Sequence, residues 1–439
     1  KLYGLGLLNA LSARITPFDT AAMASARVAR IAAHVVAGDA AIDPNENVGV
    51  YILSAKRTPI GALGGSLVDC QATELGSWAI AASVEAAGVA KEQVQECIMG
   101  NVLSAGLRQA PARQAALGAG LPVSTCCTTV NKVCASGMKA VTMGAQSILL
   151  HHADVVVAGG MESMSNVPYY LPGQARAGRG LKYGDQRILD GVAHDGLTDP
   201  ERSLAMGVFG EACSREHEIT RQEQDDYAAS SYRRSREAYS RGAFAKEIVP
   251  VTPGGRLARP VTADEEYSRG DVEAFPKLRA AFERGGTVTA ASSSTISDGA
   301  AALVLASSAT VRSLGLTPLA RIVSFADAEQ EPERFTTTPA IAIQLALKRA
   351  GLALQDVDYF EINEAFAVVV LANMKILGLD HSKVNVLGGA CALGHPIGCS
   401  GARIVATLCT VLADRQARYG VAAICNGGGG ATALVVERC

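Results

Sequence analysis

Two cysteines, a histidine and an asparagine lie in short sequence contexts that favour reactivity. Cys134 is in "VNKVCASGMKAV", immediately before residues with helical spacing. Backbone N–H groups at a helix start can lower the pKa of a thiol from about 8.5 to ~3.5–7.5 and so make it nucleophilic. A small buried hydrophobe is the commoner role of a free cysteine, so Cys134 by itself leaves both interpretations open.

The histidine and the asparagine each stand where a loop runs into a helical stretch. His395 lies between Gly394 and Pro396 in "CALGHPIGCSG". This rigid loop holds the ring outside regular structure, where it either faces a cleft or hydrogen-bonds a carbonyl. Asn363 falls where the strand in "YFEINEAFAVVVLANMKIL" meets a helix. It either caps that helix or holds a water or an oxyanion beside His395.

The second cysteine, Cys425, ends an apolar strand in "AICNGGGGATALVV". Four glycines let a ligand or an anion approach the backbone closely, although a tight hairpin would use the same residues. A strand follows rather than a helix, which argues against a dinucleotide-binding fingerprint. With Cys134 and His395, this residue strengthens the case for catalysis by a thiol nucleophile.

Alternating strand and helix patterns surround these residues. Residues 47–165 alternate short apolar runs with helical stretches and end in the buried strand "DVVVAGG". Residues 166–286 are rich in arginine, tyrosine, proline and acids, which predicts an inserted loop domain. The α/β pattern then returns, and "VCASGMKAV" to "VVVAGGMES" is echoed by "GCSGARIVATL" to "VAAICNGGGGATALVV". The sequence therefore predicts an α/β protein with two related halves around an insertion.

Composition narrows the class of protein. The 439 residues are 49% hydrophobic and 19% charged, with a net charge of -2, which does not suggest a nucleic-acid or membrane partner. This length predicts two or three domains. The 11 cysteines include no CxxC spacing, so neither a disulfide framework nor a zinc site is expected.

Residues 1–46 stand apart as an N-terminal extension. The stretch "MASARVARIAAHVV" carries Arg27, Arg30 and His34 on an alanine-rich background without acids. It resembles an amphipathic organelle-targeting segment, and Arg27-Val28 and His34-Val35 come close to the spacing of a peroxisomal import signal. A frayed extension is the alternative.

Four motifs resemble those of the thiolases in order and spacing: "NKVCASGMKA", "NEAFA", "NVLGGACALGHPIGCSGARIV" and "CNGGGGA". Closer in, "GGMESMSNVPYYLP", "DGLTD" and "TPLARIVSFADA" are similar to the mitochondrial acetoacetyl-CoA thiolases. The resemblance implies the thiolase fold, two similar βαβαβαββ halves in a five-layer αβαβα arrangement with an inserted loop domain. The N-terminal half would span 47–165 plus strands from about 287–310, the loop domain that binds coenzyme A 166–286, and the C-terminal half 311–439.

The resemblance assigns catalytic roles. Cys134 would be the nucleophile that accepts the acyl group, and His395 would take its proton. Cys425 would be the acid/base that moves a proton on the α-carbon. His395 and a water on Asn363 would line one oxyanion site, and the backbone N–H groups of Cys134 and Gly427 would form the other. Two sulfurs and one imidazole would then cover every step without a metal.

The resemblance also implies ligand-binding positions. Ser294 matches a serine that contacts the pantetheine arm of coenzyme A. Met206, Phe282 and Ala290 match positions that line the same channel. Ala205 stands where such enzymes often carry a histidine, so we expect an altered substrate affinity. Potassium, which the mitochondrial relatives bind, would be held at these positions, mostly through backbone oxygens: Tyr232, Ala290, Ala291, Ser293 and Cys391.

The implied activity is that of an acetyl-CoA C-acetyltransferase, an acyltransferase that reversibly condenses two acetyl-CoA to acetoacetyl-CoA and CoA through an acyl-cysteine. Coenzyme A is then a substrate, and no cofactor is required. A 3-ketoacyl-CoA thiolase of fatty acid β-oxidation and a non-catalytic CoA- or lipid-binding protein are the alternatives. The family also implies a homotetramer built as a dimer of dimers. The extension favours a mitochondrial location, with the peroxisome and then the cytoplasm as alternatives.

Overall fold

The strands and helices of the first half follow the predicted alternation. The computed structural model describes residues 49–171, 185–254 and 259–439, so the predicted extension 1–46 lies outside the described residues. Apolar runs that are buried on both faces form the central strands. The elements are β1 (Val50–Arg57), β2 (Gly61–Ala62), α2 (Ala72–Ala87), β3 (Glu96–Gly100), α3 (Pro111–Gly118), β4 (Cys126–Val130), α4 (Ser136–Leu149), β5 (Val155–Ser163) and, after an insertion, β8 (Ser297–Ser307).

The second half repeats this order. A short helix, α7 (Ser308–Leu314), leads into it. Its elements are β9 (Ala320–Glu329), α8 (Thr338–Ala350), β10 (Tyr359–Ile362), α9 (Ala367–Leu377), α10 (Ala390–Leu393), α11 (Ile397–Asp414), β11 (Tyr419–Asn426) and β12 (Gly430–Arg438). Glycines in the left-handed conformation end α2, α8 and α9, at Gly88, Gly351 and Gly378, because a residue without Cβ adopts that conformation most easily.

Strand order shows that the two halves are alike. The first half runs β1-β8-β5-β3-β4 and the second β9-β12-β11-β10. A bridge between Phe360 and Val384 stands where β4 would be. In each half the second strand of this order is antiparallel to both of its neighbours. In the first half β8 lies between β1 and β5, and in the second β12 lies between β9 and β11. The predicted pair of similar halves is thus confirmed, but β1 and β9 also pair, at Val50 and Ile322, and this joins the halves in one continuous sheet.

Helices arrange the halves in layers. α2 and α3 cover the outer face of the first set of strands, and α8 covers the outer face of the second. α4 and α11 pack against each other between the two sets, in the largest apolar core. Among the described helices only α11 has the length and hydropathy of a membrane span, and it is this buried middle-layer helix. The predicted αβαβα layering is therefore present.

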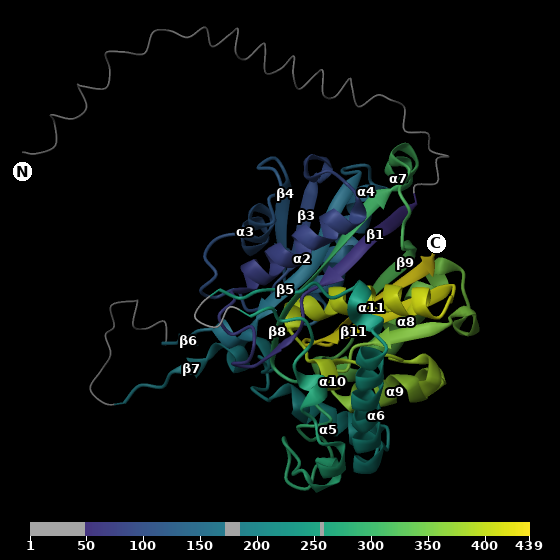
Figure 1. Ribbon diagram of the computed structural model, residues 1–439. Helices are drawn as coiled ribbons and strands as arrows, with labels where there is room; N and C mark the ends of the chain where they lie inside the picture. Colours follow the sequence, from purple (N-terminus) through teal and green to yellow (C-terminus); the bar gives the residue numbers. More distant parts are fainter. Residues whose placement is uncertain (1–48, 172–184, 255–258) are drawn as a thin grey trace, which may run out of the picture. The chain divides into compact units, whose positions relative to one another are not determined.

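The segment between β5 and β8 is the predicted insertion. It contains β6 (Tyr169–Tyr170), β7 (Leu189–Asp190), α5 (Met206–Glu216) and the polar helix α6 (Arg221–Ser240). Thr220 caps α6 through its side chain, in a capping box with Glu223. Figure 1 shows α5 and α6 beside α9 and α10, and these helices are in contact. The insertion is thereby packed against the second half, beside the segments that carry Asn363 and His395.

Candidate active site

Close packing of α4 against α11 brings the cysteine and histidine motifs together. A Cβ on Gly401 would lie 2.4 Å from the backbone nitrogen of Met138, and one on Gly137 would lie 2.8 Å from that of Ala402. Only glycine permits such an approach, because Cβ atoms essentially never come this close to the backbone. Cys134 precedes α4, His395 precedes α11, and Cys134 packs in one apolar cluster with Ile397.

Cys134 lies partly buried, two residues before α4 begins at Ser136. Its sulfur accepts hydrogen bonds from the backbone N–H groups of Gly427 and of Cys134 itself. Burial raises the pKa of the thiol to about 11, although these two hydrogen bonds act in the opposite direction. The expectation of a lowered pKa at the helix start is therefore wrong, because desolvation of the charged sulfur outweighs the donors.

Cys425 is the last residue but one of β11 and lies beside Cys134. Its side chain is buried, and burial together with the nearby Cys134 raises its pKa well above the usual range. The glycines after it form a hairpin turn into β12, with Gly428 and Gly429 at positive φ. The hairpin interpretation of this motif is thus confirmed. The turn also presents the N–H of Gly427 to Cys134, so the two sulfurs and this donor lie together.

His395 is held in one orientation by Ser400. The imidazole is buried, and its Nδ1 lies 2.6 Å from Ser400 Oγ. That hydroxyl donates to the carbonyl oxygen of Pro396 at 3.0 Å, so Nδ1–H is the donor in the pair with Ser400. The Nε2 atom then carries a lone pair, and it has no hydrogen-bond partner among the described residues. Burial and, less strongly, Arg403 lower the pKa of His395 to about 3, which keeps the ring neutral.

Asn363 follows β10 and is also buried without a polar partner. Neither its Oδ1 nor its Nδ2 has a hydrogen-bond partner within the described ranges. Its backbone N–H donates to Ala423 on β11, at 3.0 Å, two residues before Cys425. The alternative that Asn363 caps α9 is wrong, because Phe366 occupies the N-cap position. A buried amide without a partner instead favours a bound water or ligand.

Two adjoining cavities open beside these groups. One, of about 370 Å³, is lined by His395 and by the predicted channel residues Met206, Phe282 and Ser294. Ala205 lines it as well, whereas Ala290 is exposed and is not part of its lining. The second, of about 650 Å³, is lined by Val133, Gly427 and Gly428 among others, and it shares Thr198 and Met206 with the first. Cys134, Asn363 and Cys425 do not themselves line either cavity in the described part of the chain.

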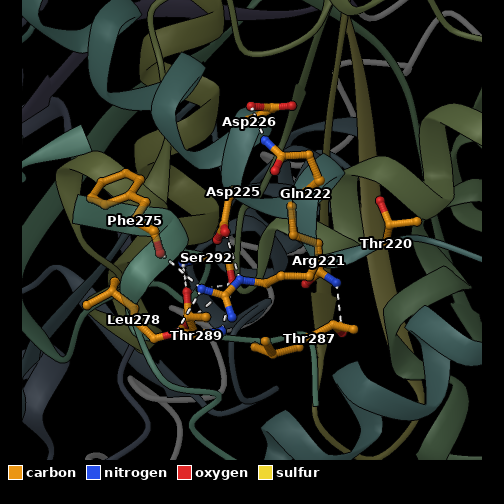
Figure 2. Close-up of polar contacts among 12 residues, drawn as sticks. Thr220, Arg221, Gln222, Asp225, Asp226, Phe275, Leu278, Thr287, Thr289 and Ser292 are labelled. Atoms are coloured by element: carbon orange, nitrogen blue, oxygen red, sulfur yellow. Dashed lines mark hydrogen bonds and ion pairs between the residues drawn. The ribbon is translucent and has the colours of Figure 1, made fainter. Parts of the chain in front are cut away.

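The channel residues are held by the insertion. Figure 2 shows Arg221 of α6 reaching Asp225 and the backbone carbonyls of Phe275 and Leu278. This fixes the segment that leads to Phe282, whose ring lies where a side chain on Gly207 would be. A hydrogen-bonded turn between Thr289 and Ser292, also drawn in Figure 2, leads into Ser294. Ser294 in turn hydrogen-bonds the carbonyl oxygen of Ala365, just beyond Asn363.

Glu162 was not predicted as part of the site. This buried carboxylate at the end of β5 accepts backbone N–H groups of Val102, Leu103 and Gly398 and the amide of Asn101. Desolvation raises its pKa to about 7, against the effect of these donors. It thereby ties the first half to the start of α11, next to His395. A charged residue inside the buried run "VVVAGGMES" was the only signal for it in the sequence.

The predicted potassium positions lie close together. Tyr232 and Ala291 are buried in one cluster with Ala392, the neighbour of Cys391. The hydroxyl of Ser293 donates to Thr289, and the thiol of Cys391 lies 3.9 Å from the carbonyl oxygen of Glu364. A tyrosine hydroxyl and backbone carbonyls are oxygen donors of the kind that potassium accepts, so these residues fit the ion in part.

Comparisons with known proteins agree with this architecture. Residues 50–309 match the thiolase N-terminal domain and residues 316–438 the thiolase C-terminal domain. An acetyl-CoA acetyltransferase of Schizosaccharomyces pombe is 54% identical over 89% of this chain and 99% of its own. A mitochondrial acetyl-CoA acetyltransferase of Bos taurus is 53% identical over 89% and 91%. A cytosolic one of Gibberella zeae is 54% identical over 88% and 98%.

A solved structure agrees as well. The crystal structure of Acat5 thiolase from Ascaris suum in complex with coenzyme A is similar to this chain with a TM-score of 0.84. The two sequences are 44% identical, over 89% of this chain and all of the other. Both domain matches, the relatives and the fold lead to one conclusion: the chain belongs to the thiolase family.

Proposed function

We propose that the chain is an acetyl-CoA C-acetyltransferase that reversibly joins two acetyl-CoA into acetoacetyl-CoA and CoA. The observation that carries this proposal is a buried, neutral imidazole, two neutral thiols and the buried Asn363 amide, which has no hydrogen-bond partner among the described residues. The relatives over most of the chain are named for this activity. The function combines an acyl-enzyme step with a carbon–carbon bond step.

In the acyl-enzyme step, His395 Nε2 takes the proton of Cys134 as the sulfur attacks the thioester carbonyl. A base is required because the pKa of the thiol, about 11, leaves it protonated at neutral pH. The oxyanion that forms is stabilised by the N–H groups of Cys134 and Gly427, and losing one such donor typically costs about 2.7–4 kcal/mol. His395 then returns the proton to the departing sulfur of coenzyme A.

In the condensation step, Cys425 first passes its thiol proton to His395 Nε2, and the resulting thiolate removes a proton from the α-carbon of a second acetyl-CoA. The enolate oxygen is held by His395 and by a water bound to Asn363, whose amide has no other partner in the described structure. The α-carbon attacks the acyl group, the bond to Cys134 breaks, and His395 Nε2 gives its proton to the departing Cys134 sulfur. The neutral ring and the imidazolium both keep Nδ1–H, so the Ser400 hydroxyl accepts from Nδ1 in both steps while it donates to the carbonyl oxygen of Pro396.

Two variants test these roles. Cys134→Ala should abolish turnover and leave CoA binding intact. Cys425→Ala should still form an acyl-enzyme from acetoacetyl-CoA, but slowly. Cys70→Ala, at a buried cysteine of the outer layer, is the matched control and should keep normal kinetics. Normal turnover by either active-site variant would overturn the assignment.

The channel residues support a site for the pantetheine arm. Met206, Phe282 and Ser294 line the same cavity as His395. The Ascaris suum relative was crystallised in complex with coenzyme A. Placing the arm in this cavity leads the thioester towards His395. A cavity-blocking variant, Gly207→Trp, should raise the Michaelis constant for acetyl-CoA far more than that for a truncated thioester.

Substrate length separates this proposal from a 3-ketoacyl-CoA thiolase, because both share all catalytic groups. The relatives named acetyl-CoA acetyltransferases favour the short chain. Thiolysis of acetoacetyl-CoA should outpace that of ketohexadecanoyl-CoA, and the reverse order would favour the alternative. Iodoacetamide labelling tests the non-catalytic alternative. In a binding protein without activity, the Cys134 thiol should not react fast with iodoacetamide, and acetyl-CoA should not protect it from labelling.

Potassium, assembly and location extend the proposal. Tyr232 and the backbone at Ala291 would hold the ion, which would supply a fixed positive charge beside the loop that carries Ser294. Equal rates and equal CoA affinity in sodium and potassium salts would count against this site.

The proposal also covers assembly and location. The homotetramer is tested by light scattering, which measures the mass of the particle in solution. Relatives include mitochondrial and cytosolic forms, and imaging of a fusion carrying residues 1–46 tests the mitochondrial location.

A further inference from the structure

Two cysteines outside the active site face each other on neighbouring strands. Cys97 of β3 and Cys127 of β4 are direct partners in the parallel register. Cys97 is buried under the outer helices, and Cys127 is half-buried on the last strand of the described sheet. Neighbouring strands lie about 4.7–4.9 Å apart, and disulfides join Cα atoms about 4.4–6.8 Å apart. The register therefore places the two sulfurs within bonding reach.

Arg113 of α3 holds a positive charge against this pair. Its Nη1 lies 3.9 Å from the sulfur of Cys127 and donates to the carbonyl of Thr125 at 2.7 Å. Its Nη2 donates to the carbonyl of Val123, also at 2.7 Å, so the guanidinium is fixed at both ends. None of these residues lines the cavities beside His395. The pair thus has its own charged partner, independent of the catalytic thiols.

The two sulfurs differ in acidity. A hydrogen bond from the Cys97 thiol and, less strongly, Arg113 lower the pKa of Cys127 to about 6, although burial opposes them. The hydrogen bond with Cys127 and burial raise the pKa of Cys97 well above its usual range. A thiol of lowered pKa therefore lies beside a thiol of raised pKa, which is how an oxidisable cysteine and its resolving partner are arranged.

We propose that Cys97 and Cys127 form a reversible, peroxide-sensitive dithiol site that is separate from the catalytic cysteines. The Cys127 thiolate attacks one oxygen of hydrogen peroxide, the O–O bond breaks, and a sulfenic acid forms while hydroxide leaves and is protonated. The Cys97 sulfur then attacks the Cys127 sulfur and loses its proton. The S–O bond breaks, water leaves and the S–S bond forms. Two thiols and one peroxide thus give one disulfide and two waters.

Peptide mapping after peroxide treatment tests the proposal. The full chain carrying Cys134→Ser, which removes the catalytic thiol, should yield a joined Cys97–Cys127 peptide pair with two hydrogens lost. Dithiothreitol should reverse the change. In Cys97→Ala the resolving thiol is missing, so dimedone should label Cys127 instead. Cys126→Ser, at the exposed neighbour, is the matched control and should still form the disulfide.

Rates give the second test. Arg113→Gln should slow the loss of the free Cys127 thiol severalfold at pH 7, because the thiolate loses its charged partner. An equal rate in this variant, or a disulfide that requires Cys126, would overturn the site. Free Cys97 and Cys127 thiols in a wild-type sample whose Cys134 is already fully oxidised would overturn it as well.

Discussion

At the scale of single residues, the site depends on groups that are largely removed from solvent. Cys134, Cys425 and His395 all rest in their neutral forms because burial disfavours each charged form. A thiolate–imidazolium pair, common where a helix start activates a cysteine, is therefore not the resting state.

Ser400 is the residue that sets the orientation of the His395 ring, to which we assign a catalytic role. Ser400→Ala removes the partner of His395 Nδ1, so the imidazole can rotate and the wrong ring form can dominate. The loss of one such hydrogen bond corresponds to about 1–3 kcal/mol, or roughly a 5–150-fold fall in kcat. Steady-state kinetics should show this fall with little change in the Michaelis constant, and Ser400→Thr should recover most of it. A kcat unchanged in Ser400→Ala would contradict the positioning role.

Burial of His395 also predicts how stability depends on pH. The unfolded chain protonates this ring near 6.5, whereas the folded chain does so only near 3, so the unfolded state binds more protons between these values. The free energy of unfolding should therefore fall as pH drops from 6.5 to 3, by up to about 1.4 kcal/mol per pH unit for this residue. His381, whose pKa burial lowers to about 4, acts in the same direction.

Urea titrations across this range check the prediction. His395→Asn should flatten the acid limb of the stability curve relative to the wild type. The exposed His151→Asn is the matched control and should leave the limb unchanged. Parallel curves for all three proteins would contradict the buried neutral imidazole.

At the scale of elements, most of the site's placement could be predicted from sequence. Short apolar runs and helical spacing predicted the order of strands and helices, and the echo between the motifs around Ser136 and Ser400 predicted the two halves. The pKa direction of Cys134 could not be predicted, because burial depends on segments far away in the sequence. The continuous sheet could not be predicted either. The pattern of apolar residues shows which faces of a strand are buried, but it does not show that the edges of β1 and β9 pair.

Contact between α4 and α11 is the element-scale feature on which the site depends. A methyl group at Gly401 would collide with the backbone of Met138, so Gly401→Ala should push the helices apart and destabilise the protein by about 1–3 kcal/mol. Activity should fall further than stability, because Cys134 and His395 separate. Gly210→Ala in α5 is the matched control, with its nearest neighbour at 3.6 Å, and should be neutral or stabilising by up to about 1 kcal/mol. Thermal melts and activity assays of both variants test this prediction, and equal stability and activity of the two variants would contradict it.

At the scale of the whole molecule, the two halves share one sheet and one middle layer. Pairing of β1 with β9 continues the strands across the boundary, and residues from Val48 to Cys439 form one compact unit. Sequence patterns suggested separate halves around a loop domain, and those exact boundaries stay a prediction. A continuous sheet implies that neither half can lose its structure without exposing the other's core.

Glu162 offers a way to test this unity, because it accepts N–H groups from both halves. Glu162→Gln places an amide N–H₂ against two backbone donors, which leaves them unsatisfied at about 1–3 kcal/mol each. Calorimetry should show a lower midpoint but still a single transition, since the shared sheet and the α4–α11 core couple the halves. The exposed Glu92→Gln is the matched control and should melt as the wild type does. Two resolved transitions in Glu162→Gln would mean that this carboxylate, and not the sheet, holds the halves together.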